Sequence, residues 1–142
     1  ETIAALAAEA VGCMDAAQRM TTEYLRTRKQ FGRPIGSFQA LQHRAAEMLV
    51  NIEQARSMAM LGAMTVLEED ADQRSRLMSG VKIQVGRSLR FVGQQTVQMH
   101  GGIAMTMEYG GGHYFKRLTA IDTMFGDVDH HVRVLSATDG LI

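Results

Sequence analysis

Residues 77–102 read LMSGVKIQVGRSLRFVGQQTVQMHGG, and this stretch decides the fold. Side chains that favour a protein core recur in it at three- and four-residue spacing: Leu77, Val81, Val85, Leu89, Val92, Thr96 and Met99. That spacing predicts one apolar face of a long helix. The glycine pair Gly101-Gly102 ends the helical pattern, and it frees the backbone to turn and to come close to a ligand.

Two helical patterns of similar length precede this one. The first covers residues 3–25, and its stripe is Ile3, Ala7, Ala10, Met14, Ala17 and Tyr24. A polar turn over residues 28–36 follows and holds the only proline, Pro34. Ser37 is a candidate N-cap for the second helix. The stripe of that helix is Phe38, Leu41, Ala45, Met48, Ile52, Ala55, Ala59 and Gly62.

The rest of the chain predicts shorter elements. The acidic run over residues 68–72 suits the N-terminus of the third helix. We expect a short helical segment over residues 113–123, a last helix over residues 127–138, and no strand. Long helices joined by short turns predict an all-α fold, an antiparallel up-and-down four-helix bundle with short extra helical segments. Glycines within the stripes, at positions 62, 80, 86 and 93, predict close approach of another helix or a ligand.

Composition narrows the class of protein. The 142 residues suffice for one domain with a hydrophobic core. Fifteen basic and fifteen acidic residues give no electrostatic case for nucleic acid or an anionic membrane as partner. The single cysteine, Cys13, fits a reducing cytoplasm and an inert core thiol. No apolar run is long enough to span a bilayer.

The first residues point to a longer protein. The chain begins Glu1-Thr2-Ile3, and helical periodicity is already present at Ile3 without an N-cap before it. We therefore expect residues 1–142 to be one helical-bundle domain, a fragment that lacks preceding sequence.

A few residues suggest ligand binding on physical grounds. A guanidinium at Arg28 can hold a phosphate through two hydrogen bonds, or it can simply complement the dipole at the end of the first helix. Phe38 and Gln39 offer an apolar plate and an amide to a ring system. Ahead of the glycine pair, Gln98 and His100 offer an amide and an imidazole that can hydrogen-bond a polar cofactor.

Two motifs carry a resemblance to a known family. Residues 28–43, RKQFGRPIGSFQALQH, followed by Ala46-Glu47-Met48, resemble the R-x-x-F-G-x-x-I-x-x-F-Q segment of acyl-CoA dehydrogenases. Residues 98–103, QMHGGI, followed by Glu108-Tyr109, resemble the Q-x-x-G-G-x-G segment of the same family. Residues 113–117 occupy the place of the family's R-D-A or K-R-L run. Residues 125–131, FGDVDHH, resemble the small subunits of pimeloyl-CoA and steroid-side-chain dehydrogenases, which act as heteromers.

The resemblance implies the C-terminal helical domain of a FAD enzyme that dehydrogenates acyl-CoA thioesters at the α and β carbons. The N-terminal helical domain and the middle β-domain would then be absent from this chain. The implied partners are acyl-CoA, electron-transfer flavoprotein, and further subunits in a homo-oligomer (dimer or tetramer) or a heteromer. The implied FAD-binding residues are Arg28, Gln30, Phe31, Phe38 and Gln39, with Gln98, Met99, His100, Gly101 and Gly102 along the ADP part.

The catalytic base is the point where the chain departs from the family pattern. The family's glutamate usually falls in Y-E-G-T, and here Gly126 stands at its expected place. Asp127, one position on, is a candidate base, although a role as N-cap of the last helix is favoured. Glu1 falls where some family members place the base, in a loose alignment. Alternatively, this subunit is non-catalytic and supports a partner's flavin.

Other chemistries find little support. The run Asp127-Val128-Asp129-His130-His131 brings together carboxylates and imidazoles, but at helical spacing only Asp127 and His131 share a face. We expect no metal site. A di-iron bundle needs Glu-x-x-His pairs, and the sequence contains none.

Overall fold

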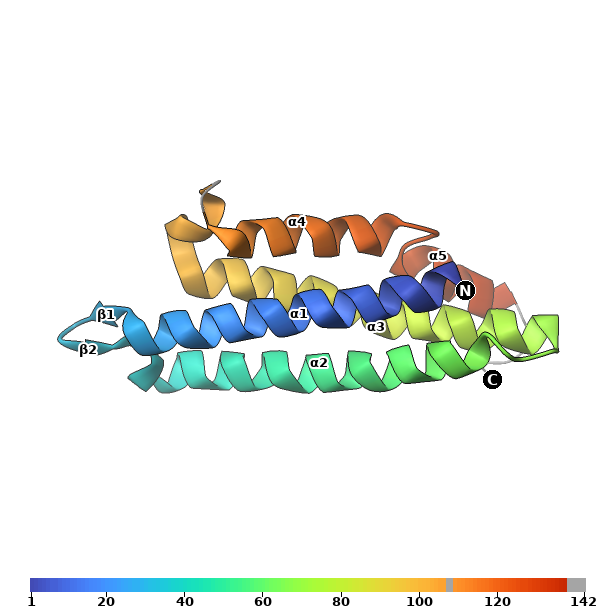
Figure 1. Cartoon of the computed structure of the whole chain (residues 1–142), viewed down its shortest axis with the longest axis horizontal. Coiled ribbons are helices and arrows are strands. Elements are labelled where there is room, and N and C mark those ends of the chain that lie inside the picture. The colour runs from blue at the N-terminus through green and yellow to red at the C-terminus, as the bar shows by residue number, and fades with distance from the viewer. Residues whose placement is uncertain (107–108, 138–142) are drawn as a thin grey trace.

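The computed structural model describes residues 1–106 and 109–137 of the chain (Figure 1). In chain order its elements are α1 (Thr2–Thr27), β1 (Lys29–Gln30), β2 (Arg33–Pro34), the 3-10 turn η1 (Ile35–Ser37), α2 (Gln39–Thr65), α3 (Ala71–His100), the 3-10 turn η2 (Gly101–Met105), α4 (Gly110–Thr123) and α5 (Val128–Ala137). The expected Glu108 and Thr138 lie outside the described residues.

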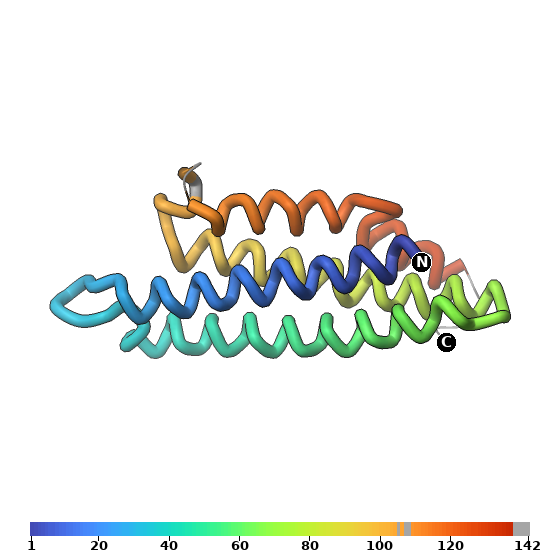
Figure 2. The backbone as a smooth tube through the Cα atoms, viewed as in Figure 1, coloured from blue at the N-terminus to red at the C-terminus, as the bar shows by residue number. Residues whose placement is uncertain are grey.

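Four helices run up and down in an antiparallel bundle, as predicted (Figure 1). α1 and α3 form the middle and run in the same direction, while α2 and α4 run the other way on opposite sides of them (Figure 2). The short α5 packs against α3. Because α1 and α3 are parallel, the loops that follow their C-terminal ends lie at the same end of the bundle.

The predicted apolar stripes form the core. The buried members of the three stripes are Ala7, Ala10, Met14, Ala17, Met48, Ile52, Ala55, Gly62, Val81, Val85, Leu89, Val92, Thr96 and Met99. Leu118 and Ile121 of α4 complete the cluster. Burial of this face, more than helix propensity, stabilises helices of this kind.

Three of the four stripe glycines lie where another side chain approaches closely. A Cβ on Gly86 would lie 2.6 Å from Cγ2 of Val128, and one on Gly93 would lie 3.1 Å from Cδ2 of Phe115. A Cβ on Gly62 would lie 3.3 Å from Val81. The prediction for Gly80 is wrong, since a Cβ there would meet no atom within 4 Å.

The segment between α1 and α2 departs from the prediction in two ways. It contains a small antiparallel hairpin, β1–β2, where no strand was expected. The chain turns at Phe31 and Gly32, whose φ angles of +55° and +78° suit a two-residue hairpin loop. Ser37 does not cap α2: its hydroxyl donates to the carbonyl of Pro34 (2.7 Å). The residue at the N-cap of α2 is Phe38, which supplies no side-chain hydrogen bond.

Candidate functional site

The bundle brings the two sequence motifs to one end. Residues 28–39 follow the C-terminal end of α1, and residues 98–102 form the C-terminal end of α3 and the turn after it. These ends are neighbours because α1 and α3 run in parallel (Figure 1). Segments about seventy positions apart in the sequence therefore form one surface, which we call the hairpin end.

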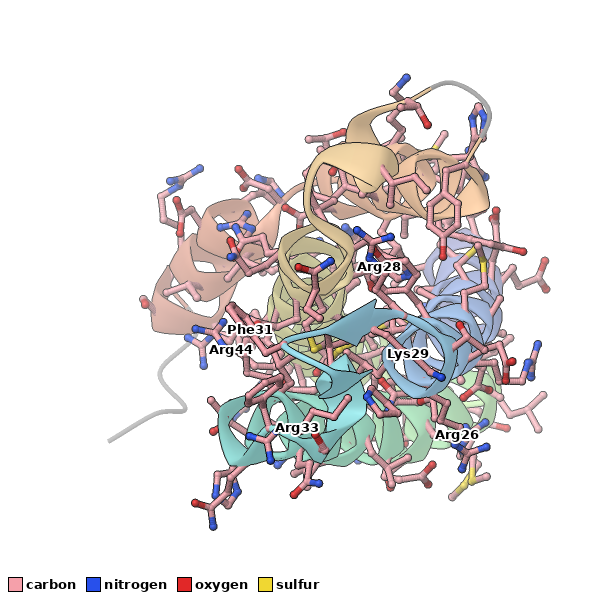
Figure 3. The ribbon with its side chains drawn as sticks, turned by 90° about the vertical axis from the view of Figure 1, so that its left-hand side faces the viewer. Arg26, Arg28, Lys29, Phe31, Arg33 and Arg44 are labelled. Atoms are coloured by element: carbon pink, nitrogen blue, oxygen red, sulfur yellow. The ribbon has the colours of Figure 1, made fainter. Side chains whose placement is uncertain are left out.

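The hairpin end is rich in unpaired positive charge. Figure 3 shows Arg26, Arg28, Lys29, Arg33 and Arg44 gathered around the hairpin. In the described part of the chain, none of these side chains lies within ion-pair distance of a carboxylate. Neighbouring cations that form no ion pairs repel one another, so this surface favours an anionic ligand or an acidic partner.

An exposed aromatic side chain projects from the same surface. Phe31 is 90% exposed and adopts a left-handed backbone conformation, which costs an L-residue about 1–2 kcal/mol. Its ring meets the ring of Phe38 edge-on at 6.0 Å, and the guanidinium of Arg33 lies 4.2 Å above the centre of Phe38. An exposed, strained aromatic residue of this kind indicates a binding role. Gln30 and Gln39 are exposed beside it.

The end of α3 divides into an exposed and a buried part. Gln98 is exposed, whereas Met99 and His100 are buried and face the bundle interior. Nδ1 of His100 lies 2.7 Å from the carbonyl of Thr96, and its ring packs between Tyr24 (4.6 Å) and Tyr109 (4.8 Å). His100 therefore fixes the end of α3 through these contacts rather than presenting its ring to the surface.

The glycine pair leaves an open stretch of backbone. Gly101 has a φ of +64°, and its N–H bonds the carbonyl of Val97 at the helix end. Both glycines are exposed, and a Cβ on either would meet no atom within 4 Å. A ligand can thus approach the backbone here without meeting a side chain of this chain.

The turn between α4 and α5 lies toward the other end of the bundle. Phe125 and Gly126 both adopt left-handed conformations, with φ of +56° and +95°. A Cβ on Gly126 would lie 2.4 Å from Cδ2 of His130, so no larger residue fits there in this conformation. The carboxylate of Asp127 accepts a hydrogen bond from the backbone N–H of His130 (2.8 Å), which lowers the pKa of Asp127. Asp127 therefore caps α5.

Polar side chains of α3 and α5 hold the end of α4 and the turn that follows it. The ammonium of Lys82 donates to the carbonyls of Ile121 (3.1 Å) and Asp122 (2.8 Å), and burial lowers the pKa of Lys82. Arg90 pairs with the carboxylate of Asp122 at 2.6 Å. His131 lies 3.0 Å from the carbonyl of Phe125, and its pKa is lowered, mainly by burial.

The candidate base does not belong to the hairpin end. Lys82, which contacts the end of α4 just before this turn, precedes His100 by 18 residues of α3, or roughly 27 Å along the helix axis. Asp127 is therefore far from Arg28 and the glycine pair. No local sequence pattern indicated Lys82 as a support for the end of α4, because its partners are 39 and 40 positions away.

Three other features of the described residues were considered as candidate sites: the single cysteine, a metal site and a membrane-spanning helix. Cys13 is half-buried rather than fully buried, and burial raises its pKa, so it stays a thiol at neutral pH. Within residues 1–106 and 109–137, no three His, Cys, Asp or Glu side chains gather as a metal site would require. None of the helices described there combines the length and the apolar character needed to cross a membrane.

Comparison with known proteins agrees with this fold. The family model for the C-terminal domain of acyl-CoA dehydrogenases matches residues 4–138. Acyl-CoA dehydrogenase IpdE2 of Mycobacterium tuberculosis is 38% identical over 112 residues, which are 79% of this chain and 33% of that protein. IpdE2 of Mycolicibacterium smegmatis is 36% identical over 132 residues, 93% of this chain and 40% of that protein. The chain thus spans between a third and two fifths of these relatives.

Solved structures give the same result. The Tcur3481-Tcur3483 steroid ACAD G363A variant matches with a TM-score of 0.89 at 29% identity, over 95% of this chain and 37% of that chain. The ChsE4-ChsE5 complex from Mycobacterium tuberculosis matches with a TM-score of 0.81 at 27% identity, over 95% of this chain and 36% of that chain. The chain belongs to the acyl-CoA dehydrogenase family and corresponds to its C-terminal helical domain.

Proposed function

We propose that this domain holds the ADP part of FAD at its hairpin end, within an acyl-CoA dehydrogenase. The observation that carries the proposal is the combination on one surface of unpaired arginines, the exposed ring of Phe31 and the open backbone of Gly101-Gly102. Guanidinium groups suit phosphate oxygens, and bare backbone suits close contact with a cofactor.

The residues present fit this cofactor unequally. Arg28 would hold the diphosphate, with Gln30 and Phe31 beside it, and Phe38 and Gln39 would line the next stretch. Gln98 and the two glycines would contact the ADP part. Met99 and His100 are buried, so their role would be to fix the turn that carries the two glycines. FAD, when bound, supplies the hydride acceptor for α,β-dehydrogenation of the acyl-CoA thioester. The domain's own task is to bind and orient it.

The same proposal assigns proton abstraction to another subunit. Asp127 is engaged as a helix cap, and Gly126 has no room for a side chain. The positive φ of Gly126 suits the glycine of the family's Y-E-G-T better than its glutamate, which would put the apolar Phe125 at the position of the base. Either alignment leaves the turn without a free carboxylate. The alternative, an enzyme that uses Asp127 as its own base, requires the α5 cap to be released.

This assignment fits a heteromeric enzyme. Two of the similar structures bear paired names, Tcur3481-Tcur3483 and ChsE4-ChsE5, and the second is a complex. By analogy, the partner of this chain would be a second acyl-CoA dehydrogenase subunit, with electron-transfer flavoprotein accepting the electrons in the cytoplasm. Exposed apolar side chains along α2 and just after it, among them Met60, Met64 and Leu67, are available for subunit contact.

The test uses the full-length protein, purified alone and with its partner subunit. Absorbance spectra report bound flavin, and bleaching by acyl-CoA substrates reports its reduction. We expect the complex to bind FAD and to be reduced, and Asp127→Asn to leave the reduction rate unchanged, because asparagine also caps helices. Arg28→Gln should weaken FAD binding. A wild-type complex without flavin would overturn the cofactor assignment, and loss of reduction in Asp127→Asn with flavin retained would restore Asp127 as the base.

A further inference from the structure

Arg44 lies next to the proposed cofactor residues, although neither sequence motif indicated it. On α2 it follows Leu41 by three residues, and Leu41 follows Phe38, the N-cap of α2, by the same step. On α3, Gln95 precedes Gln98 by the same step. Nη1 of Arg44 donates a hydrogen bond to Oε1 of Gln95 at 2.7 Å. This bond joins α2 to α3 about one helical turn away from Leu41 and Gln98.

This hydrogen bond orients the guanidinium without neutralising it. Gln95 carries no charge, and no carboxylate in the described part of the chain pairs with Arg44. One contact occupies one of the five N–H donors of an arginine. The others remain available on the surface where Figure 3 shows Arg44 beside Phe31.

Arg44 increases the positive charge of the hairpin end. Arg44 adds a charge to a surface that already carries Arg28 and Arg33, and in the described part of the chain none of these three guanidinium groups forms an ion pair. Some arginines elsewhere in the chain do pair with acids: the partly exposed Arg56 pairs with Asp15, and the exposed Arg117 pairs with Glu9.

We infer that Arg44, oriented by Gln95, is a further binding residue for the ADP half of a dinucleotide, to which it donates a hydrogen bond at a phosphate or ribose oxygen. The inference rests on the proposed function and extends it from the two sequence motifs to the surface between α2 and α3. Gln95 acts as a positioning residue, because its amide oxygen holds the guanidinium that would meet the ligand.

The experiment measures FAD affinity of the full-length protein with its partner subunit, after removal and re-addition of flavin, at several salt concentrations. The variants are Arg44→Gln, Gln95→Leu and the double variant. Arg76→Gln, an exposed arginine near the other end of α3, is the matched control. Arg28→Gln is measured in parallel, and thermal unfolding of each flavin-free protein checks the fold.

We expect Arg44→Gln to weaken FAD binding about ten-fold and to reduce its dependence on salt, since a charge-assisted hydrogen bond is lost. Gln95→Leu should weaken binding less, and the double variant should match Arg44→Gln, because Gln95 acts through Arg44. The control and all flavin-free melting temperatures should stay at wild type.

Two results would overturn the inference: FAD affinity of Arg44→Gln within two-fold of wild type, or a loss that also appears in the control or in the melting temperature of the flavin-free protein. If Arg28→Gln weakens binding while Arg44→Gln does not, only this inference fails. If the wild-type complex binds no FAD, the proposed function fails with it.

Discussion

Two glycines of α3 should respond in opposite ways to the same substitution. A Cβ on Gly86 would lie 2.6 Å from Cγ2 of Val128 and 2.9 Å from Oδ1 of Asp122. Neither neighbour yields easily, because Val128 is buried and β-branched and the carboxylate of Asp122 is held by Arg90. Overpacking of this kind costs about 1–3 kcal/mol. A Cβ on Gly80 meets nothing within 4 Å.

Both alanine variants gain about 1 kcal/mol from helix propensity. Gly80→Ala should therefore raise the free energy of unfolding by about that amount, and Gly86→Ala should lie below it by the overpacking cost of about 1–3 kcal/mol. Urea unfolding followed by far-UV circular dichroism measures the difference, provided that the slope with urea concentration is the same for both variants. Equal stabilities of the two variants would refute the packing of α5 and of the end of α4 against α3.

Three further outcomes are expected. Phe31→Asn should raise the free energy of unfolding by up to about 1 kcal/mol, because asparagine tolerates the left-handed conformation and the Phe31 ring is 90% exposed; a drop in stability would contradict this. Asp127→Ala should cost about 1 kcal/mol while Asp127→Asn costs little, measured by urea unfolding; equal losses would argue against the cap. The pKa of His131 is lowered in the folded protein, so as the pH falls below about 6.5 this histidine is protonated in the unfolded chain before it is protonated in the folded one. The free energy of unfolding should therefore decrease as the pH falls from about 6.5 to the folded-state pKa of His131, and it should depend less on pH in His131→Gln. A pKa of His131 at or above 6.5, measured by NMR titration of the folded protein, would contradict this expectation.

The helical bundle could be predicted because its signals are local and repeated. Each stripe places a residue of the core face at mostly three- and four-residue steps over about six turns, and the members at Met14, Ile52 and Leu89 are all buried. The hairpin carries no such signal. Its strands have two residues each, and its turn uses Phe31-Gly32 instead of the Asn-Gly pair typical of such loops.

The sequence assigned two roles to the end of α3, and the helix geometry separates them. Met99 belonged both to the apolar stripe and to the expected cofactor residues. His100 follows Thr96 by four positions, and Thr96 is itself in the stripe, so the same periodicity turns both side chains inward. Gln98, between stripe positions, points outward. The Arg44–Gln95 contact spans 51 positions, and no local pattern can predict such a pair.

The topology separates the two chemical tasks of the proposed enzyme within one chain. Parallel α1 and α3 bring two helix ends and their loops into one surface with unpaired arginines. The turn at Phe125–Asp127 instead follows the end of α4, which Lys82 holds to α3 at a point roughly 27 Å along that helix from His100. A change at that turn, such as the absence of a carboxylate, does not touch the packing of the hairpin end. A domain of this shape can therefore keep its proposed role in holding a cofactor for a partner while the base is supplied by the other subunit.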